Sequence, residues 1–138
     1  MKQKSTAPRL DLRRIGLAAG ASVATSAAWY AAWGTRLAEL DDAYAADARP
    51  PAWVLPVELA RSTTVATAVA VLAGRIGDAG PGSRLRLGAG LWAAFPVVLL
   101  TGSVVHEKVP WQQAAIHGGD WLAKLLLVAG IVGGGRRS

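Results

Sequence analysis

The chain has 138 residues, of which 52% are hydrophobic and only 17% charged, below the ~25% charged residues of an average soluble protein. Cysteine is absent, which excludes disulfide scaffolds, thiolate metal sites and cysteine nucleophiles. The formal net charge is +6, but the basic residues stand between long apolar runs and no aromatic residue accompanies the N-terminal ones. We therefore expect no nucleic-acid partner.

Four apolar runs are long enough to cross a bilayer, which takes about 20 residues of helix. Helix is the expected structure in each, because backbone inside lipid must satisfy its polar groups within the segment. We predict an all-α, polytopic membrane protein with a single transmembrane domain at 15–133, a basic N-terminal segment at 1–14 and a basic tail at 134–138. The four predicted spans are residues 15–33, 54–76, 87–105 and 112–132.

Two features modify these spans. Pro96 lies in the middle of the third span, where a missing N–H group and a bulky ring predict a kink or a helix–helix contact. The loop at 35–48 is rich in alanine, and we expect it to extend the first span as helix beyond the membrane. A cleaved signal peptide is disfavoured, because the first apolar run is long and three more spans follow.

The distribution of charge predicts the orientation. Ten of the 15 Lys and Arg residues fall on the side of the two termini and the second-to-third loop, and three fall on the other side. By the positive-inside rule both termini are expected in the cytoplasm, and the protein in the inner cell membrane as a multi-pass protein. Several aromatic residues near the outer span ends predict an interfacial belt: Trp29, Tyr30, Trp33, Trp53 and Trp111.

Three stretches resemble one protein family. The first span ends in Trp29-Tyr30, although Ala31-Ala32 follows where the family pattern has Gly-Pro. The third span contains a Gly-x-x-x-Trp-x-x-Phe stretch at 88–95, and the fourth contains Ala-Ile-His-Gly-Gly-Asp-Trp-Leu-Ala-Lys at 115–124. Together they resemble a bacterial membrane family known as domain of unknown function 1761. The resemblance implies four membrane helices, no established activity and no known catalytic residue.

The fourth span carries three ionisable residues on one helical face. His117, Asp120 and Lys124 are spaced i, i+3 and i+7, and the acid precedes the lysine in the favourable i, i+4 order. Near the centre of a span Asp and Lys cost about 2.5–3.5 kcal/mol each, so this face should look into the bundle. One reading is a proton or ion relay, or a ligand anchor. The other is a neutralised intrahelical pair that holds the bundle in register.

The second span offers another pair, Glu58 and Arg61, spaced i and i+3. It is either an interfacial ion pair or a group that meets the polar face of the fourth span at similar depth. We predict that the second and fourth spans are neighbours through these groups. A metal site from His106, His117 and Asp120 is disfavoured by its loose spacing, so we expect no metal and no cofactor.

Small residues recur every four positions along the first span. This stripe consists of Gly16, Gly20, Ala24 and Ala28. Such a stripe lets two helix backbones approach closely. It is either a contact with a neighbouring helix of the same chain or the interface of a homo-oligomer.

These patterns favour a non-enzymatic membrane protein, either a small transporter-like unit or an accessory membrane subunit. The alternative is a membrane-embedded enzyme that uses His117 and Asp120 as acid and base on a lipid or quinone-type substrate. The lipid bilayer is the one partner that the sequence predicts, and it does not identify a ligand.

Overall fold

A computed structural model of the chain describes residues 9–45, 49–77 and 80–133, and within them every regular element is helical. The all-α prediction is therefore confirmed. Four helical rods in this part of the chain, one of them made of α3 and α4, are long and apolar enough to cross a membrane. The elements are α1 (Leu12–Leu40), η1 (Asp42–Tyr44), α2 (Val54–Ile76), α3 (Pro81–Ala94), α4 (Pro96–His106) and α5 (Trp111–Gly133).

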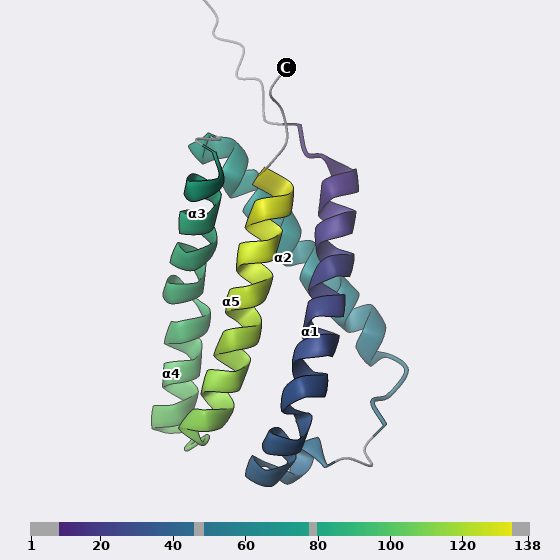
Figure 1. The fold of residues 1–138 in the computed structure, drawn as a ribbon, viewed down its shortest axis with the longest axis vertical. Helices are drawn as coiled ribbons and strands as arrows, with labels where there is room; N and C mark the ends of the chain where they lie inside the picture. Colours follow the sequence, from purple (N-terminus) through teal and green to yellow (C-terminus); the bar gives the residue numbers. More distant parts are fainter. Residues whose placement is uncertain (1–8, 46–48, 78–79, 134–138) are drawn as a thin grey trace, which may run out of the picture.

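Helix α5 occupies the centre of the bundle, where it packs against α1, α2, α3 and α4 (Figure 1). It is also the helix with the largest number of buried residues. A helix that carries Asp and Lys in its middle cannot face lipid on that side, which explains the central position. The apolar core lies between α1, α2 and α5 and consists of Ile15, Ala18, Ala66, Val69, Leu125, Val128 and Ala129.

The third predicted span is a helix interrupted at Phe95, directly before Pro96. Proline cannot donate to the carbonyl four residues earlier and its ring clashes with it, so the helix breaks at the preceding residue. The expected disturbance at Pro96 is this interruption; Pro96 itself is buried, and α4 continues the rod from there.

Helix α1 is longer than the predicted span at both ends. Asp11 caps its first turn by accepting hydrogen bonds from the backbone N–H groups of Arg13 (3.1 Å) and Arg14 (3.2 Å). The helix then runs through Ala31 and Ala32 without a break, since neither residue interrupts the backbone as Gly-Pro would. The alanine-rich loop is helical as far as Leu40, and residues 46–48 lie outside the described part.

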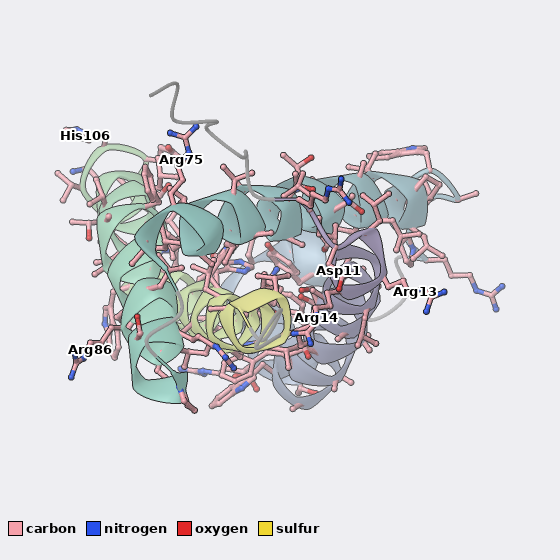
Figure 2. The ribbon with its side chains drawn as sticks, turned by 90° about the horizontal axis from the view of Figure 1, so that it is seen from above. Asp11, Arg13, Arg14, Arg75, Arg86 and His106 are labelled. Atoms are coloured by element: carbon pink, nitrogen blue, oxygen red, sulfur yellow. The ribbon has the colours of Figure 1, made fainter. Side chains whose placement is uncertain are left out.

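The described chain begins and ends at the same end of the bundle, which we call the terminal end (Figure 1). There the Arg14 guanidinium donates to the carbonyl of Ile131, 3.1 Å away, and so joins the start of α1 to the end of α5. Arg13, Arg75 and Arg86 project outward from the bundle (Figure 2). The predicted segments at 1–8 and 134–138 lie outside the described residues.

The stripe of small residues does not pack inside the chain. All four of its residues are exposed, and a Cβ added at Gly16 or Gly20 would meet no atom within 4 Å. The intramolecular reading of the stripe is therefore wrong. Alanine-rich helices carry small residues on several faces, and the bundle instead uses the face with Ile15, Ala18, Ala19 and Ser22. The homo-oligomer stays a prediction.

Candidate functional site

An ion pair lies in the middle of the central helix. Asp120 and Lys124 stand about 14 Å and about 20 Å along α5 from its first residue, at the 1.5 Å rise of an α-helix. Both are buried, with 1% and 8% of their surface exposed, and the Lys124 Nζ lies 2.8 Å from the Asp120 Oδ2. The polar face of α5 is thus turned into the bundle.

The carboxylate of Asp120 is also bonded from α1. The Ser26 hydroxyl donates to Oδ1 over 2.7 Å, and the Tyr30 hydroxyl lies 3.5 Å from Oδ2. On the other side of the pair, the Lys124 ammonium sits 4.2 Å from the centre of the Trp121 ring, a cation–π contact. A buried charge pair is stable only with such additional partners, and this one has them on both members.

His117 lies between two tyrosines. The Tyr30 hydroxyl is 2.6 Å from Nδ1, and the Tyr44 hydroxyl is 3.0 Å from Nε2. A neutral imidazole carries one N–H and one bare nitrogen, so one tyrosine donates to the ring and the other accepts from it. A continuous polar chain therefore runs from η1 to the middle of α5. We call the series Tyr44, His117, Tyr30, Asp120 and Lys124 the polar chain.

The second predicted pair reaches the same region from α2. This helix is steeply tilted and begins part-way along the bundle (Figure 1), and it contacts α5. Glu58 and Arg61 form an ion pair with each other, and the Arg61 guanidinium carbon is 6.0 Å from the Trp121 ring centre. The predicted proximity of the second and fourth spans is confirmed.

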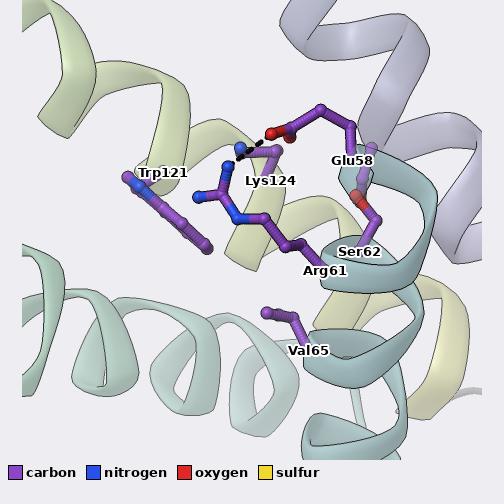
Figure 3. A pocket seen from close by; sticks show the side chains of 7 residues that line it. Glu58, Arg61, Ser62, Val65, Trp121 and Lys124 are labelled. Carbon is purple, nitrogen blue, oxygen red and sulfur yellow. Dashed lines mark hydrogen bonds and ion pairs between the residues drawn. The ribbon is translucent and has the colours of Figure 1, made fainter. Parts of the chain in front are cut away.

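A small cavity is lined by Glu58 and Arg61 of one ion pair and by Lys124 of the other (Figure 3). In the view of Figure 3 Arg61 and Lys124 both extend toward it, beside the Glu58 carboxylate. Its volume is about 10 Å³, which is room for roughly one water molecule. The lining residues are Ser22, Glu58, Arg61, Ser62, Val65, Trp121 and Lys124.

Two tryptophans hold α5 at the level of the polar chain. The Trp29 indole donates to the carbonyl of Ile116 (2.9 Å), and the Trp92 indole donates to that of Gly118 (2.8 Å). A Cβ at Gly119 would lie 2.4 Å from the Trp29 ring, so only glycine fits there. Trp29 and Tyr30 thus bond α5 through their polar atoms, and the interfacial belt stays a prediction.

The sequence pattern did not reveal the α1 and η1 partners of the site, Ser26, Tyr30 and Tyr44. A single hydroxyl side chain on an apolar helix shows no pattern in the sequence. Its role depends on which face of that helix is turned toward the bundle. The available signal was the inward face of α1, which continues from Ile15 and Ser22 at helical spacing to Ser26 and Tyr30. Extending that face would have placed both hydroxyls toward α5.

His106 does not join the site. It is exposed at the last turn of α4, on the outside of the bundle (Figure 2). Within the described part of the chain, no three His, Asp or Glu side chains are placed to hold a metal ion.

One comparison with known proteins decides the family. The model of the family described as "Protein of unknown function (DUF1761)" matches residues 14–133. The chain belongs to the DUF1761 family. Searches of curated proteins and of solved structures gave no match.

The stretches that carry the DUF1761 resemblance meet at one place in the fold. Trp29 and Tyr30 of α1 and Trp92 of α3 all contact the segment 116–120 of α5. Gly88 opens the stretch at 88–95 and lies so close to α5 that an added Cβ would be 2.9 Å from the Leu125 carbonyl oxygen. The motif residues of this DUF1761 protein therefore pack the central helix and surround its polar chain.

Proposed function

We propose that this protein is a small, non-enzymatic, transporter-like unit that moves protons through Asp120. We place it in the inner cell membrane with both termini in the cytoplasm, so that η1 lies at the outer side. The observation that carries the proposal is the polar chain, which links the outer end of the bundle to a buried carboxylate at mid-depth.

Each member of the polar chain is able to pass a proton on. Tyrosine hydroxyls and imidazole can accept a proton on one lone pair and release another from the same group. The separations of 3.0 Å and 2.6 Å at the two nitrogens of His117 are ordinary hydrogen-bonding distances, and the 3.5 Å between the Tyr30 hydroxyl and Asp120 Oδ2 is the longest step of the chain. Asp120 is the natural end point, because an intramembrane carboxylate paired with a lysine is an arrangement that proton-moving proteins use.

The cytoplasmic half of the bundle is closed by apolar side chains. Ile15 of α1 and Leu125, Val128 and Ala129 of α5 pack together on the terminal side of the ion pair. Access to Asp120 is therefore one-sided in this conformation. Such asymmetry supports a transporter that opens its two sides in turn rather than an open channel.

The embedded enzyme is less well supported. An acid–base role for His117 and Asp120 requires a substrate beside them, but tyrosines bond both ring nitrogens of His117. The cavity next to Lys124 has room for roughly one water molecule, far less than a quinone ring or lipid headgroup needs.

Proton uptake by liposomes tests the proposal. Purified protein is reconstituted with the pH-sensitive dye pyranine trapped inside, and acid is added outside with valinomycin and potassium present to cancel the membrane potential. We expect the wild type to acidify the lumen faster than protein-free liposomes. Tyr30→Phe should slow this at least about tenfold, because it breaks the proton path between His117 and Asp120.

The matched control is Thr101→Val. It also removes a hydroxyl, but one that bonds the carbonyl of Val97 within its own helix on the exposed side of α4. Its rate should equal that of the wild type. A wild-type rate equal to that of empty liposomes would overturn the proposal. A stable partner protein retained in mild detergent, with no proton uptake, would favour the accessory subunit instead.

A further inference from the structure

The short turn η1 covers the outer end of the polar chain. We propose that η1 is a gate over His117, and that a hydrogen bond between Asp41 and Gln113, here called the latch, holds it closed. The gate would control access to the proposed proton path, but its existence does not depend on protons moving through that path.

Tyr44 is the part of η1 that closes the site. Its hydroxyl lies 3.0 Å from the Nε2 of His117, and the two ring centres are 5.8 Å apart. On its other side Tyr44 is exposed, with 38% of its surface open. Because Tyr30 bonds Nδ1, His117 has protein partners at both nitrogens only while Tyr44 is in place.

Asp41 ties three elements together at this point. Its backbone N–H donates to the carbonyl of Leu37 and so ends α1. Its Oδ1 accepts from the backbone N–H of Ala43 (2.9 Å) and its Oδ2 accepts from the Nε2 of Gln113 (3.2 Å). Gln113 is buried in the first turn of α5, so the latch fixes η1 relative to the helix that carries His117.

The surroundings of the latch leave room for η1 to move. A hollow of about 430 Å³ opens to the outside beside it, and no residue of η1 is buried. Water in the hollow competes for the Asp41 carboxylate, and an exposed three-residue turn held by few bonds belongs to the least stable part of a fold. The hollow is lined by Glu39, Leu40, Asp41, Asp42, Val109, Pro110 and Gln113.

Chemical modification of the two histidines tests the gate. The full-length protein in lipid nanodiscs is treated with diethyl pyrocarbonate, and the rates at His117 and His106 are measured by mass spectrometry of the peptides. His106 is exposed on α4 and serves as the internal reference. We expect His117 to react at least about tenfold more slowly than His106, because Tyr30 and Tyr44 occupy both ring nitrogens of this partly buried histidine while η1 is closed.

Three variants give the decisive comparison. Tyr44→Ala should raise the His117 to His106 ratio at least about tenfold, and Gln113→Leu about three- to tenfold, the change expected when one net hydrogen bond no longer holds the closed state. Glu39→Gln is the matched control, because Glu39 lines the same hollow but bonds Arg36. It should leave the ratio unchanged.

An unchanged ratio in Tyr44→Ala would overturn the gate. Tyr44 lies on an exposed turn, so this variant decides the question even if Gln113→Leu, altered at a buried position, fails to fold. If the wild type takes up protons but Tyr44→Ala leaves the His117 to His106 ratio unchanged, the gate alone is refuted. If Tyr44→Ala raises that ratio but the wild type takes up no protons, the proposed function alone is refuted.

Discussion

At the scale of single residues, the stability of the site depends on Asp120 and Lys124 being present together. Removing the charge of Asp120 leaves the Lys124 ammonium buried without its counter-ion, which costs about 3–5 kcal/mol. We therefore expect Asp120→Asn to lower the free energy of unfolding by that order, as measured by denaturation in detergent followed by circular dichroism.

The matched control is Glu58→Gln, which removes one partner of the ion pair between Glu58 and Arg61. Both of those side chains are partly exposed, and such pairs contribute at most about 1 kcal/mol. If Asp120→Asn were as stable as the wild type, the carboxylate would be hydrated and the buried pair would not exist as described.

The sequence predicted the ionisable residues of the site because charges in an apolar helix are conspicuous and their spacing sets their face. It did not predict the neutral partners. Tyr30 and Tyr44 lie 87 and 73 positions from His117 along the chain, and only the packing of α1 and η1 on α5 brings them together. The ring of Tyr30, near the end of the first span, also suited the interfacial belt, which concealed its contacts with His117 and Asp120.

At the scale of helices, glycines set how closely α3 approaches α5. A Cβ at Gly88 would lie 2.9 Å from the backbone of α5, whereas at Gly90 it would meet nothing within 4 Å. We expect Gly88→Ala to destabilise the protein by about 1–3 kcal/mol through overpacking. Gly90→Ala should be neutral or up to about 1 kcal/mol stabilising, because alanine favours helix. Equal effects in thermal melts would contradict the close approach.

The exposed stripe on α1 gives a second prediction at this scale. Gly20 has open space around it, so Gly20→Leu should leave the melting temperature of the single chain unchanged or raise it slightly, because leucine favours helix over glycine. If the stripe joins two copies, the larger side chain separates the backbones, and native mass spectrometry should show dimer in the wild type and monomer in the variant. Monomer in both would mean that the stripe faces lipid.

The periodicity of small residues identified a face of α1, but not the face that packs against the other helices. Small residues occur on two faces of this helix, so side-chain volume alone does not predict which of them is buried. The face used has Ile15 and Ser22, and its continuation carries the hydroxyl donors that Asp120 needs. By contrast, Pro96 was sufficient to predict the interruption between α3 and α4 from the sequence, because no tertiary contact restores the missing N–H group.

At the scale of the whole molecule, the charge asymmetry predicts the orientation in the membrane. Single cysteines at Ala45 and Gly82 lie on exposed positions at opposite ends of the bundle. A membrane-impermeant maleimide added to intact cells should label the cysteine at position 45 and not the one at position 82. Labelling at position 82 and not at position 45 would mean that the orientation is the opposite one and that the gate faces the cytoplasm.

The number of long apolar helices in the described part of the chain was predictable from hydropathy, since each apolar run is long enough to cross a membrane. The arrangement was predictable only in part. Asp120 and Lys124 require α5 to face the bundle, and Glu58 and Arg61 indicated its contact with α2. The tilt of α2 and the position of η1 over His117 depend on loop geometry, for which the sequence has no periodic signal.

We propose that the ion pair in α5 moves protons in addition to holding the helices in register. The measurement that tests it is the initial rate of lumen acidification with Asp120→Leu combined with Lys124→Leu. When both charges are removed, no buried charge is left without its counter-ion. This double variant should therefore recover much of the stability lost in Asp120→Asn. We predict that it folds and acidifies the lumen no faster than protein-free liposomes. A folded double variant with the wild-type rate would contradict the claim and leave the pair a purely structural role.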